Sequence, residues 1–396
     1  MAARLEHPDG RRCRLWWRLP AEWEHALTTW ADPFVVGLLF PMMQWQTDVR
    51  VEGPVSPSLL ANLERFMAVW RMWFPERYRP VHIAAAEENE PPRPAGPEQT
   101  VVPFSCGVDS CFTLWRHVRG LAGRQNRTIG AAVVFHGFDI WLDQPNADAI
   151  YAGLIDNART ILADVNVPCI PMTSNFHELP TLWKHSFATH LVSGLMLLQG
   201  RFTSTLIPSN VGYEDLGRAW AGHPLSDAFL GGEAFDVRDD GPECLRAEKI
   251  ALIADWPEAM RRLRVCFCNP HSAANCGVCE KCLRTMLSFK AAGFPVPPAF
   301  GGEPTLGQIR RARFPHRHNI VLYWRQIAAA ARARGLGGAP WVRAALAAIG
   351  RNRRRWFLGA LKHPLIPTRN AVRRLVRGTA LSRGQQAKRT REDSEP

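Results

Sequence analysis

The sequence has 396 residues, of which 46% are hydrophobic and 21% are charged, and this composition excludes a disordered or fibrous chain. The formal net charge of +13 is unevenly spread, because residues 1–300 hold 28 basic and 32 acidic side chains and residues 301–396 hold 21 and 4. A uniformly basic protein that coats nucleic acid is thereby excluded, and a near-neutral body with a basic appendage is indicated.

No apolar run approaches the roughly 18–20 residues that a membrane-spanning helix needs, and the longest, residues 33–43, is far too short. Polar and acidic side chains interrupt the N-terminal residues, so we expect no secretion signal. Ten cysteines in such a chain favour thiols or metal ligands over disulfides. We therefore expect a cytoplasmic protein with several domains and no membrane span.

Composition changes along the chain predict the domain boundaries. Residues 1–86 contain strand-like and helix-like runs rich in Trp and Phe, which predict an N-terminal α+β domain. These tryptophans recur among apolar neighbours, which favours a role in packing, with a Trp-lined ligand groove as the alternative. Residues 87–99 are rich in Pro and Glu and predict a linker. Residues 301–396 predict a basic helical extension with a disordered tail from about residue 382.

Residues 100–300 alternate between short apolar strands and longer helical segments. The expected strands are residues 100–104, 129–138, 167–174 and 204–210, and the helices between them are residues 111–121, 147–165 and 186–200. This alternation predicts an α/β fold, a doubly wound parallel sheet with both faces covered. Such sheets bind ligands at the carboxyl ends of their strands, so we expect four polar loops along one edge. They are residues 105–110, 136–139, 173–175 and 209–215.

The first motif, SCGVDS at residues 105–110, lies between a predicted strand and a predicted helix. This context aims several backbone N–H groups at one point, which suits a phosphate, and Gly107 permits a close approach. Ser105 and Ser110 add hydroxyl donors, while Asp109 could orient the loop or reach a metal ion. The motif lacks the Gly-Lys-Ser/Thr of a Walker loop. The alternative is a capped helix start, with Asp109 or Ser110 as the N-cap.

The second motif concentrates five of the ten cysteines between residues 266 and 282. Cys276, Cys279 and Cys282 are spaced C-x2-C-x2-C, and one upstream thiolate would complete a closed tetrahedral site. We prefer Cys266 as the fourth ligand, with Cys268 or His271 as substitutes. Zn²⁺ is the expected metal, and an iron–sulfur cluster is the alternative.

These two motifs together resemble the PP-loop ATP pyrophosphatase family. Ser-x-Gly-x-Asp-Ser after a strand is similar to its pyrophosphate loop. The segment CFCNPHSAANCGVCEKCLRT is similar to the zinc site of its 7-cyano-7-deazaguanine synthase branch. The resemblance covers roughly residues 100–295, and the whole chain resembles a broad group of bacterial proteins built on that core.

The resemblance implies a fold, a reaction and a set of site residues. The fold would be of the HUP type, similar to the adenine nucleotide α-hydrolases. In the family the loop binds the pyrophosphate of ATP, cleavage occurs between the α and β phosphates, and a substrate adenylate forms. Matched by position, the loop residues Ser105, Cys106, Gly107, Val108, Asp109 and Ser110 would bind ATP, with Asp109 and Ser110 in the catalytic role. Cys266, Cys276, Cys279 and Cys282 would bind Zn²⁺.

Two departures from the family pattern limit what can be carried over. The family usually has Gly at the position of Cys106, so phosphate binding requires Cys106 to keep a permitted φ. The segment IPSNVGYEDLGRAWAGHPLSDAF, residues 207–229, also differs from the expected surroundings of a deazaguanine substrate. We therefore do not carry over the substrate.

Further polar residues near the predicted strand ends are candidates for contact with ATP, substrate or Mg²⁺. His136 and Asp139 follow the second strand, where adenosine usually lies in such sheets. Candidates for the substrate or a magnesium ion follow the fourth strand: Ser209, Asn210, Tyr213, Glu214, Asp215, His223, Asp227 and Glu233. Lys249, Lys281 and Arg284 are candidates to reach phosphate or nucleic acid. For each residue a solvated surface position is the alternative.

In the C-terminal segment apolar residues alternate with arginine at helical spacing, as at Val342, Leu346, Ile349, Phe357 and Leu361. A basic amphipathic helix of this kind can bind nucleic acid, lie on an anionic surface or dock on an acidic partner. The alternative is a solvated surface helix.

The leading hypothesis is an ATP-dependent ligase or amidating enzyme that uses ATP, Mg²⁺ and a structural Zn²⁺. It would adenylate a carboxylate-like small molecule, releasing pyrophosphate and then AMP. A second hypothesis is sulfur transfer to tRNA or a small molecule, with a persulfide on Cys106, Cys111 or Cys169. A third is a non-catalytic module that binds nucleotide or nucleic acid. The sequence does not identify the acceptor substrate, and it leaves open whether the chain forms a homodimer.

Overall fold

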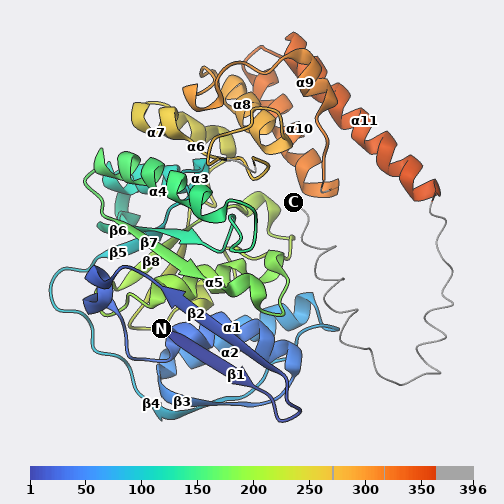
Figure 1. Ribbon diagram of the computed structural model, residues 1–396. Coiled ribbons are helices and arrows are strands. Elements are labelled where there is room, and N and C mark those ends of the chain that lie inside the picture. Colours follow the sequence, from blue (N-terminus) through green and yellow to red (C-terminus); the bar gives the residue numbers. More distant parts are fainter. Residues whose placement is uncertain (270–271, 316, 363–396) are drawn as a thin grey trace. The chain divides into compact units, whose positions relative to one another are not determined.

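The structure, a computed structural model, describes residues 1–269, 272–315 and 317–362 (Figure 1). The chain forms two compact units, one from Met1 to Asn275 and one that begins at Cys276. Within the described residues, no helix has both the length and the apolar character needed to cross a membrane. The tail that we predict to be disordered lies outside the described residues.

The first unit is built on a seven-stranded sheet with the order β1-β2-β7-β6-β5-β8-β9. The strands are β1 (Ala2–Glu6), β2 (Arg12–Arg18), β5 (Thr100–Pro103), β6 (Ile129–His136), β7 (Cys169–Ser174), β8 (Ser204–Pro208) and β9 (Asp236–Asp240). The five strands from β5 to β9 are parallel, and β1 and β2 are antiparallel at one edge. In spatial order the parallel strands are the third, second, first, fourth and fifth along the chain, which is the order of a doubly wound sheet. The strands stay parallel, but their order in the sequence changes direction between β5 and β8, and we call this place the reversal point. The predicted α/β class with a mostly parallel sheet is confirmed.

Helices cover both faces of this sheet. They are α1 (Asp32–Trp45), α2 (Pro57–Trp73), α3 (Val108–Val118), α4 (Ala147–Ala163), α5 (Trp183–Met196), α6 (Arg246–Ile253) and α7 (Pro257–Arg262). Figure 1 shows α3, α4, α6 and α7 on one side of the sheet and α5, α1 and α2 on the other. Two short parallel strands, β3 (Val49–Val55) and β4 (Ile83–Glu88), pair separately from the main sheet.

The N-terminal segment joins the central sheet, which differs from the separate domain that we predict for residues 1–86. Strand β2 pairs with β7, and the Trp17 ring packs edge-on against Phe135 of β6 with centroids 5.8 Å apart. A Cβ atom at Gly194 of α5 would lie 2.6 Å from Phe135 and 2.8 Å from Trp17, so only glycine permits this approach. The apolar runs of the segment are buried in the same core as the sheet, because they have no second layer of their own to cover them.

Helix α3 is fixed to the end of β9 by the buried carboxylate of Asp240. Thr113 donates to Asp240 Oδ2 at 2.8 Å, and His117 Nε2 lies 3.0 Å from Oδ1. The Arg116 guanidinium lies 3.4 Å from the same oxygen. Burial disfavours the charge, but these three partners outweigh it and hold the pKa of Asp240 below its usual range. The second half of α3 is therefore held against the end of β9.

The second unit is helical, with α8 (Glu280–Ala292), α9 (Leu306–Arg311), α10 (Arg317–Ala333) and α11 (Pro340–Lys362). Helix α10 packs on both α8 and α11, and α11 packs on α9. The fully buried Trp324 donates its indole N–H to Glu280 at 2.8 Å. The basic segment predicted to be helical thus forms α9, α10 and α11 within the described residues.

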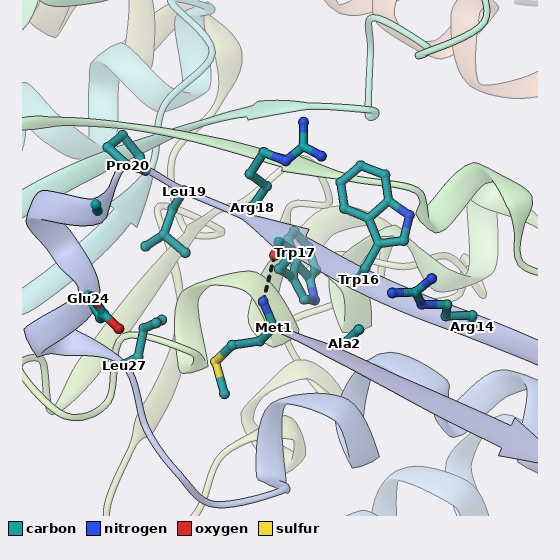
Figure 2. Close-up of a pocket in the computed structure, with 11 residues that line it drawn as sticks. Met1, Ala2, Arg14, Trp16, Trp17, Arg18, Leu19, Pro20, Glu24 and Leu27 are labelled. Carbon is teal, nitrogen blue, oxygen red and sulfur yellow. Dashed lines mark hydrogen bonds between the residues drawn. The ribbon is translucent and has the colours of Figure 1, made fainter.

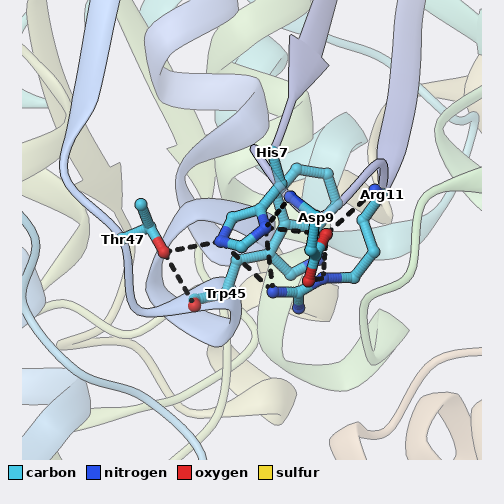
Figure 3. A network of polar contacts seen from close by, with 5 residues as sticks. All are labelled: His7, Asp9, Arg11, Trp45 and Thr47. Carbon is cyan, nitrogen blue, oxygen red and sulfur yellow. Dashed lines mark hydrogen bonds and ion pairs between the residues drawn. The ribbon is translucent and has the colours of Figure 1, made fainter.

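The turn between β1 and β2 carries a network of polar contacts at the surface (Figure 3). Asp9 Oδ2 pairs with Arg11 Nε at 2.8 Å, and His7 Nε2 lies 2.7 Å from Thr47 Oγ1. The Arg11 guanidinium lies over the Trp45 ring, 5.3 Å from its centroid. Because the Asp9 and Arg11 side chains are 50% and 46% exposed, water and salt screen this network. It connects the turn to the end of α1 and contributes little stability.

We expect Asp240→Ala to lower the free energy of unfolding by about 1–3 kcal/mol, because it leaves the buried Thr113 hydroxyl and His117 ring without their partner. Arg116 keeps its ion pair with Glu243 at 2.7 Å. The measurement is urea denaturation followed by tryptophan fluorescence. The pKa of Asp240 is lowered, so its stabilisation is present above the unfolded pKa and is lost as pH falls through the folded pKa. The difference between the two proteins should therefore shrink below about pH 4. Asp9→Asn is the control and should leave the denaturation midpoint unchanged; an equal loss in both variants would contradict the assignment.

Candidate functional site

The candidate site lies at the reversal point of the sheet. The loop Ser105–Ser110 follows β5, and residues 209–215, which include a 3₁₀ turn at Tyr213–Asp215, follow β8. These two strands are adjacent and parallel. Ligands of doubly wound sheets bind in the crevice at this point, outside the carboxyl ends of the strands. The topology therefore brings two of the four predicted loops to the position that a ligand would occupy.

Side-chain and backbone contacts close the loop Ser105–Ser110 on itself. The backbone N–H of Ser105 donates to Ser110 Oγ at 3.3 Å, and Ser110 Oγ donates to the Gly107 carbonyl at 3.1 Å. Helix α3 begins at Val108 with Gly107 as its N-cap, so the alternative that Asp109 or Ser110 caps the helix is wrong. The first N–H groups of an α-helix have no acceptor within the helix. They and the helix dipole favour an anion at this point.

Cys106 holds an unusual backbone conformation inside the loop. Its φ is +58°, in the left-handed region that non-glycine residues rarely adopt. The side chain is fully buried, and the backbone N–H of Arg264 donates to the Cys106 carbonyl at 2.8 Å. Holding a non-glycine residue in this region costs about 1–3 kcal/mol. The backbone therefore has the shape that a glycine would adopt without strain, although the residue is cysteine.

Two cations from α6 converge on Asp109. Arg246 Nη1 lies 2.8 Å from Asp109 Oδ2, and Lys249 Nζ lies 3.6 Å from Oδ1. Lys249 also donates to the Ser209 carbonyl at 2.7 Å, so one ammonium group contacts the loops after β5 and β8. Of the two positions that the sequence allows for Lys249, phosphate contact or a solvated surface, its burial excludes the second. We did not single out Arg246, although its i, i+3 spacing to Lys249 places both on one helix face.

A pair of buried carboxyl groups lies beyond Lys249, at the end of β9 and in the short helix Asp227–Leu230. Among the described residues, both carboxylate oxygens of Asp239 and Oδ2 of Asp227 are buried without a hydrogen-bond partner. Burial raises the pKa of Asp227 to about 7. Burial and the nearby Asp227 charge raise the pKa of Asp239, while Lys249 opposes that rise. Asp227 was a sequence candidate, and Asp239 was missed because nothing local marks it as buried.

The remaining candidates after β8 have other roles or stay exposed. His223 is fully buried; its Nε2 donates to the Leu216 carbonyl at 3.0 Å, and its Nδ1 accepts from Leu225 N–H at 3.1 Å. Both ring nitrogens are therefore used in holding the loop. Asp215 pairs with Arg218 at 3.0 Å. Exposed side chains are found at Asn210, Tyr213, Glu214 and Glu233.

His136 and Asp139 follow β6, which is adjacent to β5. The His136 ring is buried and stacks on Tyr151 with centroids 4.3 Å apart and an interplanar angle of 10°. Burial lowers the pKa of His136, so the imidazole is neutral at pH 7. Asp139 is exposed. His136 thus offers a flat, uncharged ring near the reversal point, whereas Asp139 is solvated.

The structure brings together four of the cysteines. The sulfur atoms of Cys266, Cys276, Cys279 and Cys282 all lie within 4.8 Å of one another. Cys268 is exposed and is not in the group; its backbone N–H donates to Cys266 Sγ at 3.3 Å. The backbone N–H groups of Cys279 and Cys282 likewise donate to the sulfurs of Cys276 and Cys279, at 3.3 and 3.5 Å. N–H donors of this kind stabilise thiolates, so this set fits a closed, structural Zn²⁺ site.

Asn275, which the sequence analysis missed, orders the segment that carries the first cysteine. Its Oδ1 accepts from the backbone N–H groups of Val265 and Cys266 at 2.9 and 3.2 Å, and its Nδ2 donates to the Leu263 carbonyl at 2.7 Å. Gly277 has a φ of +70°, which provides the tight turn between Cys276 and Cys279. The residues between the cysteines therefore set the positions of the sulfurs.

A separate surface pocket of about 620 Å³ lies at the edge of the sheet (Figure 2). Trp16, Trp17, Arg14, Arg18 and Met1 are among the residues that line it. Strand β2 is separated from β5 by β7 and β6, so this pocket is not part of the candidate site. It corresponds in part to the Trp-lined groove that was our alternative for the N-terminal tryptophans.

Comparisons with protein-family models, curated proteins and solved structures found no match to this chain. The resemblance to PP-loop enzymes therefore stays a prediction from the two sequence motifs. The function is argued below from the geometry at the reversal point of the sheet and from the cysteine cluster.

We expect the purified protein to contain one zinc ion per chain and Cys276→Ser to lose it, because three thiolates leave the tetrahedral site incomplete. Zinc content is measured by mass spectrometry of the acid-digested, dialysed protein. Cys268→Ser is the matched control and should retain the metal. Iron in place of zinc, or equal loss of metal from both variants, would contradict the assignment of a zinc site to these four cysteines.

Proposed function

We propose that this chain is an ATP-dependent enzyme that cleaves ATP between the α and β phosphates and transfers AMP to a carboxylate-like acceptor. The single observation that carries the proposal is the buried Lys249 ammonium, which contacts both Asp109 and the Ser209 carbonyl at the reversal point. A buried cation beside a helix N-terminus places positive charge and N–H donors close together, and a polyphosphate can bind both.

The loop Ser105–Ser110 would bind the pyrophosphate part of ATP. Its N–H groups at the start of α3 and the hydroxyl group of the exposed Ser105 would be the donors, while the buried Ser110 hydroxyl holds the loop through the Gly107 carbonyl. Gly107 lets the chain approach the phosphate closely. Asp109 holds Arg246 and Lys249 in place before the nucleotide binds. This preorganisation means that little rearrangement is needed when negative charge develops on the phosphates.

Asp239 fits a role in holding Mg²⁺, because its two buried carboxylate oxygens lack hydrogen-bond partners among the described residues. Hard oxygen ligands suit this ion, which usually keeps several waters and bridges to substrate phosphates. When bound, Mg²⁺ would neutralise charge on the phosphate oxygens. Lys249, an electrostatic neighbour of Asp239, connects this position to the loop Ser105–Ser110.

The proposed reaction needs no covalent protein nucleophile. An oxygen of the acceptor carboxylate attacks the α phosphorus, the bond to the bridging oxygen breaks, and pyrophosphate leaves with that electron pair. Ammonia or an amine then attacks the acyl carbon, and AMP leaves. The described residues contribute positioning and electrostatic stabilisation, which are the main sources of catalysis in phosphoryl and nucleotidyl transfer.

The thiols disfavour the sulfur-transfer hypothesis. A persulfide carrier needs an accessible thiolate, and the candidates Cys106 and Cys111 are buried. Burial raises the pKa of Cys106 to about 12 and that of Cys169 to about 11. At neutral pH these groups are protonated thiols with weak nucleophilicity. Adenylation of an oxygen acceptor is therefore the better-supported chemistry.

The proposed zinc site would have a structural role. Its four cysteines leave no open coordination position for a substrate. Cys279 is the N-cap of α8, so binding of the metal would fix the start of that helix. The site would stabilise the fold without taking part in the chemistry.

We expect the zinc-loaded protein, incubated with α-labelled ATP, Mg²⁺ and a cell metabolite extract, to form AMP and pyrophosphate. Lys249→Met should lower the rate by about 100-fold or more, because it removes a buried charge from the phosphate site. Thin-layer chromatography separates AMP, ADP and adenylylated products. Asp109→Asn should reduce AMP formation, and Asp255→Asn, a substitution at an exposed position, is the matched control. Absence of AMP with every extract fraction, from a folded protein that retains its metal, would refute the proposal.

A further inference from the structure

The second unit carries a dense set of exposed arginines that the proposed chemistry does not use. From Pro304 to Arg391 the sequence contains no Asp or Glu, so this segment supplies no carboxylate to neutralise them. Arg351, Arg354 and Arg355 are exposed on α11, and their i, i+3, i+4 spacing places them in one stripe of the helix. Such a stripe has a high positive potential.

Arg311, the last residue of α9, and Arg313 extend this stripe. Arg351 donates to the Ala312 carbonyl at 2.9 Å, and Ala312 lies between the exposed Arg311 and Arg313. The buried Asn352 side chain accepts from Phe314 N–H at 3.1 Å and donates to the same Ala312 carbonyl at 2.9 Å. These bonds fix the chain after α9 against α11. We define Arg311, Arg313, Arg351, Arg354 and Arg355 as the arginine surface.

The opposite side of α11 decides which anionic partner fits. Its apolar residues Val342, Ala345, Ala348 and Ile349 are buried within the unit. A helix that binds in the plane of a membrane needs its apolar face free to enter the lipid. The part of this face up to Ile349 packs within the unit, whereas Phe357 and Leu358 near the end of α11 are exposed beside the arginines. Two exposed apolar side chains are too few to hold a helix in lipid, so a polyanion fits better than a lipid surface.

We propose that the arginine surface binds the phosphodiester backbone of a nucleic acid. Guanidinium groups match phosphate oxygens with two parallel hydrogen bonds, and several in a row neutralise successive phosphates. Contacts to phosphate oxygens carry no base information, so we expect binding that is independent of base sequence. This inference does not depend on the proposed ATP chemistry.

The test measures binding of the full-length protein to a short fluorescein-labelled DNA duplex by fluorescence anisotropy across a salt series. The variant R311Q/R354Q/R355Q removes three charges and spares Arg351, whose hydrogen bond supports the fold. We expect at least a tenfold loss of affinity at about 100 mM salt and a salt slope that falls in magnitude by about 2 to 3. An RNA duplex and a scrambled DNA sequence should bind with affinities similar to that of the first duplex.

The matched control is R65Q/R71Q/R79Q, which removes three exposed positive charges from the first unit. It should keep the affinity within about twofold. Equal losses in both variants would show a general charge effect and overturn the proposal. Binding to phosphatidylserine vesicles without binding to duplexes would also overturn it, as would the absence of duplex binding at low salt. Thermal unfolding of each variant checks that the fold is retained.

Discussion

The burial of one positive charge, the Lys249 ammonium, is the constraint on which the arrangement of the site depends. A buried charge is costly unless it is paired and hydrogen-bonded. Lys249 meets this requirement with the Ser209 carbonyl at 2.7 Å and the Asp109 carboxylate at 3.6 Å. These partners follow β8 and β5, which are adjacent only because the sheet reverses its direction between them. Stable burial of Lys249 and assembly of the site therefore require the same topology.

The surroundings of Lys249 combine opposing electrostatic effects. Asp240 is buried but fully paired, so its pKa falls, whereas its neighbour Asp239 is buried with unpartnered oxygens, so its pKa rises. Adjacent residues of a strand point to opposite faces of the sheet, which explains how two successive aspartates differ so much. Asp240 fixes α3, whereas Asp239 is the residue that we propose to hold Mg²⁺. One dipeptide thus supports the fold and contributes to the proposed site.

The features that were predicted correctly are those that local sequence determines. The strands after residue 100, the intervening helices and the loop Ser105–Ser110 follow from apolar periodicity and turn residues over a few positions. The C-x2-C-x2-C spacing marks Cys276, Cys279 and Cys282, with Cys266 as the preferred fourth ligand, and the four sulfurs lie together. What failed depended on distant contacts. His223 is a polar residue in a polar loop, and only its two hydrogen bonds show that it is structural.

The sequence by itself determined the α/β class, the strand–turn–helix context of the loop and the candidate metal ligands, because each depends on residues close together in the chain. Tertiary structure decided the rest. The antiparallel pairing of β2 with β7 places the N-terminal segment in the central sheet. The packing of α6 directs Arg246 and Lys249 to Asp109. Burial, and with it the pKa of a carboxyl group or a thiol, is set by atoms that are remote in sequence, so no local pattern reveals it.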